Sequence, residues 1–435
     1  MLIGRTKSVC PVCLKTLEAE KLTGSDGNIY MEKTCVEHGR FRTLIWEGDL
    51  KSYLQWSMDN TATDPPVNGK KPEKGCPNDC GLCAEHLRKG CCMLLELTNR
   101  CNLHCPVCFA AAGEHSPRDL SLDEISKQYD FLMQHGGPFN IQLSGGEPTL
   151  RDDLPEIIRL GLEKGFTFFQ LNTNGIRLAD EDGYAEKLKE AGLTTVFLQF
   201  DGLTDDVYEA LRGRPLLDIK LRAIENSATA GLGVVLVPVI APGINDNQVG
   251  DILKFAISRQ PDVRGVHFQP ISYFGRCGQE RPSKPITIPK MLELIEAQTD
   301  GMMKKSDFAG GGAENPYCSF HASYRLLEDG SLKLLPKQSG SCCCCTTSDD
   351  SREHVASQWA GSCELPENAD GFDEFLKQVR DSTFAVSGMI FQDAYNLDLE
   401  RLKRCYICEV DSDYGMVPFC AYNLTNTEGK YLYRK

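Results

Sequence analysis

No stretch of this 435-residue sequence is long and apolar enough to cross a membrane, and the opening residues MLIGRTKSVC lack the apolar core of a signal peptide. Basic residues are also in deficit, because 47 Lys and Arg stand against 61 Asp and Glu. The resulting net charge of −14 argues against an overall basic surface for wrapping nucleic acid. We therefore expect a cytoplasmic protein that is not an integral membrane protein and whose favoured partner is not nucleic acid.

Cysteine, in contrast, is abundant, with 21 residues in the chain. A secreted disulfide scaffold would be short and would carry a signal peptide. A long chain without one, with cysteines two or three residues apart, instead favours metal binding. The cysteines therefore predict iron–sulfur or zinc sites.

Residues 1–60 predict a small β-rich knuckle that binds one metal ion. Cys10 and Cys13 form a CPVC pair, and Cys35 and His38 follow in CVEHG. This paired layout fits a zinc ribbon or a rubredoxin-like mononuclear iron site. The ligand types do not separate zinc from iron.

Residues 61–91 contain a polar linker and a compact group of cysteines, CPNDCGLCAEHLRKGC. Cys76, Cys80, Cys83 and Cys91 supply four thiolates within one short segment, which is enough to close an iron–sulfur cluster. We expect an auxiliary [4Fe-4S] cluster there. A structural zinc site is the alternative, and Cys92 could take the place of Cys91.

Residues 92–290 alternate short apolar runs with amphipathic helical stretches about six times. The runs end at residues 98, 144, 173, 201, 240 and 270, and one helix opens with a capping-box spacing of Ser121 and Glu124. Such alternation predicts an α/β fold with a parallel sheet whose ligands gather at the C-terminal strand ends. Because six units are fewer than the eight of a closed barrel, we expect a partial (β/α)6 TIM-like barrel.

Residues 291–435 read as a cysteine-rich and largely irregular C-terminal extension. Cys318, Cys405, Cys408 and Cys420 could together hold a second auxiliary cluster, with one member of the run Cys342–Cys345 in place of Cys408 as the alternative. Four consecutive cysteines do not easily bind one metal, because neighbouring side chains point in different directions. That run is either a redox-active or persulfide-bearing loop or a surface tract.

The loop after the first predicted strand carries only three cysteines, Cys101, Cys105 and Cys108. Three thiolates can hold a four-iron cluster and leave one iron open for chemistry, although a closed structural site is the alternative.

The second predicted strand ends in SGGEPT. Its paired glycines permit a close backbone approach, and Glu147 offers an acceptor for an ammonium group.

The motifs CNLHCPVC and SGGEPT, supported by LNTNG, LQFDG and VIAPGIND, resemble those of the radical S-adenosylmethionine (radical SAM) superfamily. The resemblance implies that Cys101, Cys105 and Cys108 hold a catalytic [4Fe-4S] cluster whose open iron takes the amino and carboxylate groups of SAM. It also implies hydrogen abstraction from substrate by a 5′-deoxyadenosyl radical. The residues expected to contact SAM are Phe109 beside adenine, Gly145, Gly146 and Glu147 at the amino group, and Asn172, Thr173, Gln199, Asp201 and Val239 at the ribose, carboxylate or base.

The whole-chain layout is similar to the branch that contains tetraether lipid synthases and proteins described as pterin-methylating. That branch implies a rubredoxin-like site and auxiliary clusters beside the catalytic one, and an electron donor such as ferredoxin or flavodoxin. We expect hydrogen abstraction from an unactivated carbon followed by carbon–carbon or carbon–sulfur bond formation on a lipid or peptide, with pterin or other small-molecule methylation as the alternative. A non-catalytic iron–sulfur electron-transfer protein is the alternative from another class.

Overall fold

A computed structural model describes residues 1–57, 63–81, 83–113, 118–277, 281–312, 314–336, 347–361 and 369–434. The run Cys342–Cys345 lies outside these residues. Within the described ranges, no helix has the length and apolar character needed to span a membrane.

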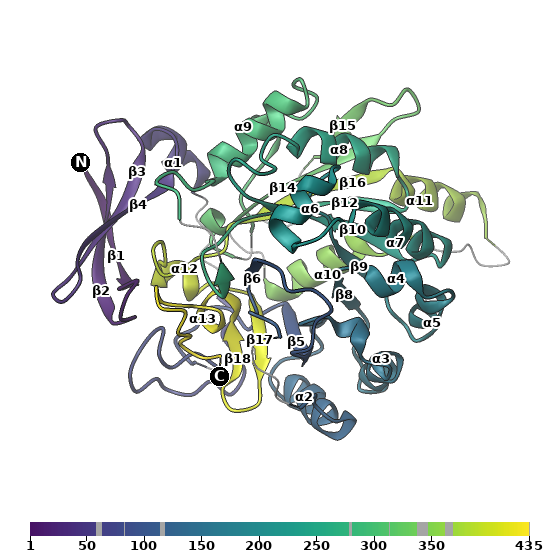
Figure 1. Cartoon of the computed structure of the whole chain (residues 1–435), viewed down its shortest axis with the longest axis horizontal. Helices are drawn as coiled ribbons and strands as arrows, with labels where there is room; N and C mark the ends of the chain where they lie inside the picture. The colour runs from purple at the N-terminus through teal and green to yellow at the C-terminus, as the bar shows by residue number, and fades with distance from the viewer. Residues whose placement is uncertain are drawn as a thin grey trace.

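Six parallel strands form the centre of the molecule (Figure 1). In spatial order they are β5 (Cys92–Thr98), β7 (Asn140–Gly145), β8 (Phe169–Thr173), β9 (Thr195–Gln199), β10 (Gly233–Val237) and β12 (Val263–Pro270). Every neighbouring pair is parallel. Because most residues of these strands are buried, they appear in the sequence as nearly continuous apolar runs. The predicted partial barrel is confirmed.

Helices connect the strands and cover one face of the sheet (Figure 1). They are α2 (Leu122–Gln134), α3 (Leu154–Glu163), α4 (Ile176–Asp180), α5 (Tyr184–Glu190), α6 (Asp205–Arg212), α7 (Leu217–Thr229) and α8 (Val249–Ser258), followed by α9 (Ile288–Gln298). The predicted capping box is present at α2, where the Ser121 side chain accepts from the Glu124 amide and the Glu124 carboxylate accepts from the Ser121 amide.

The C-terminal region extends the central sheet at both edges, so the expectation of a largely irregular region was wrong. Strands β14 (Ser319–Leu326), β15 (Leu332–Leu334) and β16 (Thr383–Met389) continue it beyond β12, whereas β17 (Ile407–Asp411) and β18 (Gly415–Pro418) continue it beyond β5. Strand β16 is parallel to β12, and β17 is parallel to β5. These strands join distant partners and lack the local alternation with helices that made the six central strands recognisable. Helices α10 (Ser348–Trp359) and α11 (Gly371–Asp381) lie between β15 and β16 in the chain.

The N-terminal knuckle is an antiparallel four-stranded sheet of β1 (Leu2–Val9), β2 (Thr16–Thr23), β3 (Ile29–Cys35) and β4 (Gly39–Trp46), followed by α1 (Leu50–Trp56). It projects from one end of the molecule beside C-terminal segments (Figure 1). Asp398 fixes it there, because its carboxylate accepts from the Thr6 hydroxyl at 2.6 Å and pairs with Lys21 at 2.5 Å. The buried Lys33 ammonium adds a bond of 2.7 Å to the Ala394 carbonyl.

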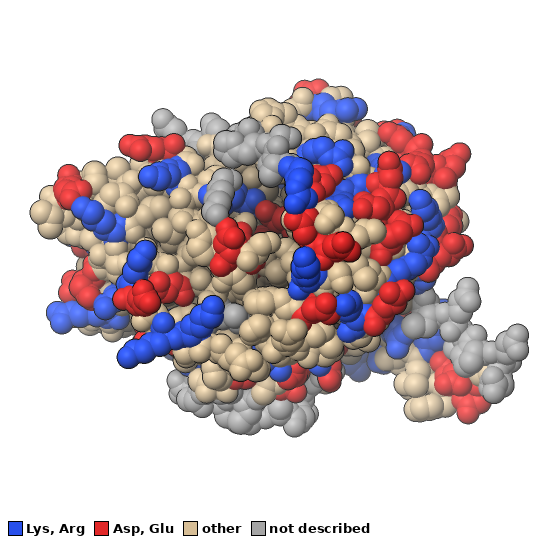
Figure 2. Space-filling view, turned by 90° about the horizontal axis from the view of Figure 1, so that it is seen from below, with Lys and Arg blue, Asp and Glu red and all other residues tan. Residues whose placement is uncertain are grey.

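Charges of both signs are interspersed on the face shown in Figure 2. Many exposed basic side chains pair with carboxylates, as Arg5 does with Glu20 at 3.2 Å and Arg118 with Glu124 at 2.5 Å. Paired surface charges of this kind contribute little to stability. Most of the visible charge is therefore distributed as local pairs.

Candidate active site and metal centres

The C-terminal ends of the six central strands surround a cavity of about 250 Å³. This is the position at which parallel α/β folds bind ligands. The three-cysteine loop forms one wall, and the ends of β7, β8, β9, β10 and β12 form the others. C-terminal residues close the remaining side.

Cys101, Cys105 and Cys108 all line this cavity, and no other cysteine is among the described residues that do so. Short strands β6 (Val107–Cys108) and β13 (Arg276–Cys277) pair and hold the loop, and Arg276 donates its Nε to the Cys105 carbonyl at 2.8 Å. Burial raises the pKa of the Cys101 thiol to about 12, so a bound cation is needed to make it a thiolate near neutral pH. Three converging thiols without a fourth fit a cluster with one open iron.

Gly145 and Gly146 allow β7 to end directly against the backbone that leads into the cysteine loop. A Cβ atom on Gly145 would lie 2.3 Å from the Thr98 carbonyl oxygen, and one on Gly146 would lie 2.2 Å from that of Arg100. The Gly146 amide donates to the Thr98 carbonyl at 2.7 Å. Both glycines line the cavity, but the close approach that demands them is to the protein backbone.

Glu147 lines the same cavity and connects the ends of β7 and β8. Its carboxylate, 1% exposed, accepts from the Thr173 hydroxyl at 2.7 Å and from the Asn174 amide at 2.8 Å. The Thr149 hydroxyl donates a third bond of 2.7 Å. These bonds fix the orientation of a negatively charged group beside the cysteine loop.

Asp201 is not among the described residues that line the cavity, and its contact with SAM stays a prediction. The carboxylate is completely buried and forms a bidentate ion pair with Arg212, in which both N–O distances are 2.7 Å. The Val239 amide donates to it at 3.0 Å. Of this pair, Arg212 lines the cavity. It also donates to the Val107 carbonyl at 3.1 Å.

Arg212 and Lys220 are two buried cations near the cysteine loop that the sequence interpretation missed. The Lys220 ammonium donates to the Asn174 carbonyl at 2.5 Å and to the Gln199 side-chain oxygen at 3.1 Å. Burial lowers the pKa of Lys220 to about 7. The burial of Lys220 could have been predicted from its position in α7, because it shares one helical face with Ala223, Ile224 and Ser227. All four residues of this face are buried.

Five uncharged polar side chains also line the cavity and form its polar row. Gln142 comes from β7, Asn172 from β8, Gln199 from β9, and His267 and Gln269 from β12. The Asn172 amide donates to Gln142 at 3.2 Å, and His267 Nδ1 lies 2.8 Å from the Ser387 hydroxyl. Burial lowers the pKa of His267 to about 4, which keeps its ring neutral at physiological pH.

Four phenylalanine rings, the aromatic wall, also line the cavity. The Phe419 ring lies 5.4 Å from that of Phe109, 6.0 Å from Phe274 and 4.5 Å from Phe391, measured between centroids. Phe109, expected near adenine, is therefore part of a larger apolar surface suited to flat or aliphatic ligands.

Asn172, Thr173, Gln199 and Val239 also line the cavity, so their predicted location at one site is consistent with the geometry. Ser144, Asn174 and Arg276 join them from the described part of the chain. None of these contacts identifies which part of a ligand each residue meets.

The knuckle brings together Cys10, Cys13, Cys35 and His38, whose ligand atoms all lie within 4.8 Å of one another. Cys13 Sγ is 4.0 Å from Cys35 Sγ, and His38 Nδ1 is 3.4 Å from Cys35 Sγ. A tetrahedral zinc with Zn–S bonds of about 2.3 Å has sulfurs about 3.8 Å apart. The four ligands therefore fit a single tetrahedral ion.

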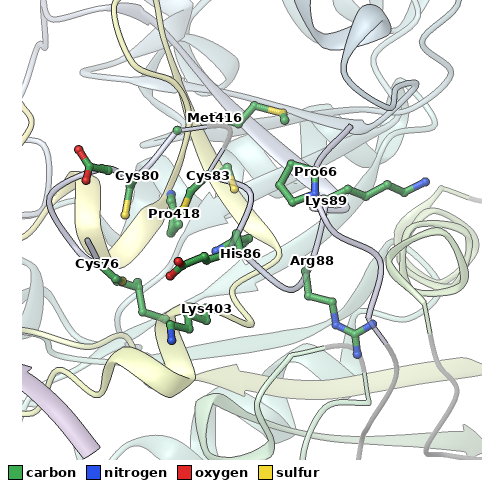
Figure 3. A pocket seen from close by; sticks show the side chains of 15 residues that line it. Pro66, Cys76, Cys80, Cys83, His86, Arg88, Lys89, Lys403, Met416 and Pro418 are labelled. Carbon is green, nitrogen blue, oxygen red and sulfur yellow. The ribbon is translucent and has the colours of Figure 1, made fainter. Parts of the chain in front are cut away.

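Cys76, Cys80 and Cys83 lie around a second cavity, with Lys403 and Pro418 nearby (Figure 3). Cys91, predicted as their fourth partner, is not among the residues that line it, whereas Cys408 is. Residues 86–91 run beside the backbone of residues 403–406, as shown by the bond of 2.8 Å from the Cys91 amide to the Tyr406 carbonyl. The assignment of Cys91 to the loop thiols stays a prediction.

Cys318, Cys405 and Cys420 form a third buried group. Burial, with a contribution from the neighbouring Cys318, raises the pKa of the Cys405 thiol to about 12. Arg401 donates to Cys318 Sγ at 3.5 Å, and the Gln392 amide donates to Cys420 Sγ at 3.3 Å. Cys408, predicted in this group, is among the residues that line the cavity of Cys76, Cys80 and Cys83, and its assignment stays a prediction.

Two family models match the sequence. The Radical SAM superfamily matches residues 95–256, and the HMPTM N-terminal zinc ribbon domain matches residues 2–47. The first covers the cysteine loop and most of the central strands, and the second covers the knuckle.

A protein of Methanocaldococcus jannaschii named 7,8-dihydro-6-hydroxymethylpterin dimethyltransferase is 35% identical over 96% of this chain and 93% of its own length. A GTP 3′,8-cyclase of Paenarthrobacter nicotinovorans is 33% identical over 67% of this chain and 91% of its own. Among solved structures, Streptococcus suis SuiB bound to S-adenosylmethionine is 16% identical, with a TM-score of 0.42 over 48% of this chain and 47% of that chain. The open cysteine loop, the parallel sheet and the full-length relative lead to one assignment: the chain is an enzyme of the radical SAM superfamily, which uses a [4Fe-4S] cluster and SAM.

Proposed function

We propose that Cys101, Cys105 and Cys108 hold the catalytic cluster and that the adjoining cavity binds SAM and substrate together. When bound, the cluster and SAM supply a 5′-deoxyadenosyl radical that removes a hydrogen atom from an unactivated substrate carbon. Gly145, Gly146 and Glu147 would position the amino group of SAM. The cavity walls exclude water, which protects a reactive carbon centre from side reactions.

The chain's own side chains prepare this site electrostatically. Arg212 presents a positive charge beside Cys105 and is held there by Asp201. It would offset the negative charge of the thiolates and the cluster, and it could bind a carboxylate. An electron from a donor such as ferredoxin or flavodoxin in the cytoplasm would start each turnover.

For the substrate we propose a flat, nitrogen-rich heterocycle of the pterin class, from one carbon of which the radical removes a hydrogen atom. The observation that carries this proposal is that one cavity is lined both by four phenylalanines and by the uncharged polar side chains of Gln142, Asn172, Gln199, His267 and Gln269. The amides and the neutral imidazole can donate to and accept from the edge of a heterocycle, while aromatic rings pack on its faces. The M. jannaschii relative is named for a pterin substrate, which supports the same class.

A lipid chain is the second candidate, because the cavity wall also contains Leu94, Val237 and Ile407 beside the phenylalanines. This apolar side could shelter an aliphatic tail. The uncharged polar side chains in the same lining favour the smaller substrate.

The test of the catalytic assignment is production of 5′-deoxyadenosine by anaerobically reconstituted protein with dithionite. Replacing Cys101, Cys105 and Cys108 together by alanine should abolish it. The matched control replaces Cys277, which lies on β13 outside the proposed ligand set, by alanine and should retain cleavage. Cleavage that persists in the triple variant would refute the assignment.

The test of the substrate uses deuterium. Turnover with deuterated 7,8-dihydro-6-hydroxymethylpterin should place deuterium in 5′-deoxyadenosine, because the abstracted atom moves to the 5′ carbon. A deuterated acyl or isoprenoid lipid should give none. Transfer from the lipid and not from the pterin would reject the pterin proposal while leaving the catalytic assignment intact.

A further inference from the structure

A turn near the C-terminus, residues 423–432, lies between the knuckle and the catalytic cysteine loop. Asn426 fixes the shape of this C-terminal turn through hydrogen bonds within it. Its side-chain oxygen accepts from the Glu428 amide at 3.0 Å and from the Lys430 amide at 2.8 Å. Its own amide donates to the Lys430 carbonyl at 3.0 Å. The side-chain nitrogen of Asn426 is therefore left to bind outside the turn.

The C-terminal turn contacts the knuckle at the loop that carries the first two of its four metal-binding residues, residues 10–13. Asn426 Nδ2 donates to the Val12 carbonyl at 2.8 Å. The Thr427 amide donates to the Pro11 carbonyl at 3.0 Å. The turn therefore holds the stretch of backbone that lies between two ligands of the knuckle.

Thr425, which directly precedes Asn426, contacts the catalytic side. Its hydroxyl accepts from the Gly275 amide at 2.8 Å and donates to the Asn423 carbonyl at 2.8 Å. Gly275 has a φ of +65°, and a Cβ atom on it would lie 2.4 Å from the Cys108 carbonyl oxygen. Thr425 therefore holds Gly275 directly against the last residue of the cysteine loop.

Arg276, which follows Gly275, extends this contact along the cysteine loop. It pairs with Cys108 in the small sheet of β6 and β13, and its Nε donates to the Cys105 carbonyl at 2.8 Å. Its guanidinium also donates to the Ala112 carbonyl at 3.2 Å. Because these bonds come from one residue, the backbone position of Gly275 determines where the loop is held.

Apolar packing joins the same three segments. Val9 of the knuckle, Phe274 and Leu424 belong to one buried cluster, and Phe109 of the cysteine loop packs against it. A hydrogen bond that is lost in such surroundings leaves a polar group unpaired at a considerable cost. The bonds of the turn therefore restrict the relative positions of the segments that the cluster packs together.

We propose that Thr425 and Asn426 are positioning residues that fix the cysteine loop relative to the metal-binding loop of the knuckle. The inference rests on the proposed assignment of Cys101, Cys105 and Cys108 to the catalytic cluster. A metal ion in the knuckle immobilises its loop, and the turn then holds the cysteine loop in place. The knuckle thus supports SAM cleavage without contacting SAM or substrate.

The experiment measures hydrogen exchange by mass spectrometry in peptides of residues 99–113, using the full chain after anaerobic reconstitution. Thr425→Val keeps the shape of the side chain but removes the acceptor for the Gly275 amide, so exchange should rise about threefold or more. Thr425→Ser keeps the hydroxyl and should exchange like wild type. Asn426→Asp keeps the oxygen that closes the turn but loses the donor to Val12, and it should also raise exchange in these peptides.

A kinetic measurement separates positioning from a general loss of stability. In Thr425→Val and Asn426→Asp, the KM for SAM in 5′-deoxyadenosine formation should rise about threefold or more, because a displaced cluster binds SAM less well. Iron content should stay that of wild type. The matched control is Glu428→Gln, which changes an exposed side chain of the same turn and should alter neither exchange nor KM.

The role of the knuckle metal is tested with Cys13→Ala, which removes one of its four ligands. This variant should raise exchange in residues 99–113. Adding Asn426→Asp to it should have little further effect, because the second change breaks a contact through which the first already acts.

Three results would overturn the proposal. They are unchanged exchange in residues 99–113 when residues 420–434 exchange faster, equal acceleration in β8 and β9, and full additivity of Cys13→Ala with Asn426→Asp. Failure of the catalytic assignment has a different signature, since cleavage would then persist without Cys101, Cys105 and Cys108 whatever the exchange shows.

Discussion

At the scale of single residues, the pairing of Asp201 with Arg212 connects stability to the catalytic site. Both groups are almost fully buried, and the guanidinium lies between the carboxylate and the cysteine loop. A buried charge is tolerated when it is paired, and removal of one partner costs about 3–5 kcal/mol. The pair therefore positions Arg212.

We expect Asp201→Asn to lower the free energy of unfolding by about 3–5 kcal/mol, because the Arg212 charge loses its partner. Urea titration at pH 7.5 measures this change. Asp152→Asn removes a carboxylate whose side chain is 91% exposed in its pair with Arg177, and should change stability by less than about 1 kcal/mol. Equal effects of the two substitutions would contradict the positioning role.

Lys220 predicts a specific pH dependence. Its pKa is about 7 in the folded chain against 10.5 when unperturbed, so above pH 7 the unfolded state retains a proton that the folded state has released. Stability from this group therefore rises with pH between these values. From pH 7.0 to 8.5, wild type should gain up to about 2 kcal/mol relative to Lys220→Met.

The control for this prediction is Lys254→Met, which removes a half-exposed lysine paired at 3.6 Å with Asp300. Its stability relative to wild type should not change over the same pH interval. A constant difference between wild type and Lys220→Met would show that Lys220 stays protonated.

At the scale of elements, the contact between the end of β7 and the backbone after β5 determines whether the cysteine loop can form. We expect Gly145→Ala to lower stability by roughly 1–3 kcal/mol or more and to reduce iron at the catalytic cluster, because its Cβ meets the Thr98 carbonyl oxygen at 2.3 Å. Gly371→Ala is the matched control, since a Cβ there meets nothing within 4 Å. Full iron content in Gly145→Ala would contradict this account.

The elements that could be predicted from the sequence are those whose structure depends on residues close together in the chain. The six parallel strands were predictable because burial on both faces produces apolar runs, and the cysteine loop and SGGEPT were recognisable because they directly follow strand ends. Strands β16 and β17 were not predictable, since each pairs with a strand far away in the sequence. The same distance hid the relation of Cys408 to the loop thiols.

The buried charged residues of the site could not be predicted from the sequence either. Arg212 lies on a helix whose sequence looks amphipathic, and arginine in such a helix is ordinarily exposed. Only the fold shows that its side chain turns inward to Asp201. Asp201 was assigned a ligand contact because it lies in LQFDG, one of the motifs that resemble those of radical SAM enzymes.

At the scale of the whole molecule, Asp398 joins the knuckle to the segment that carries Arg401 and the C-terminal cysteines. Its carboxylate is 2% exposed and holds both Thr6 and Lys21. We expect Asp398→Asn to increase hydrogen exchange in β1 and β2 at least about tenfold, the change that a loss of about 1.4 kcal/mol produces. Zinc content should remain one per chain.

Glu20→Gln is the control for this substitution, because its carboxylate belongs to an exposed pair with Arg5 on the same sheet. Exchange should then be unchanged. Loss of zinc in Asp398→Asn would mean that the knuckle depends on docking to fold, which the compact group of Cys10, Cys13, Cys35 and His38 argues against.

The parallel pairing of β17 with β5 also has a consequence for biosynthesis. On the ribosome, β5 and the thiols around it emerge long before the strand that will lie beside them. Until Cys408 and Arg434, which binds Glu96 through two bonds of 2.7 Å, have been translated, neither the sheet edge nor the loop cavity is complete. This edge of the central sheet can therefore form only after the C-terminal residues have left the ribosome.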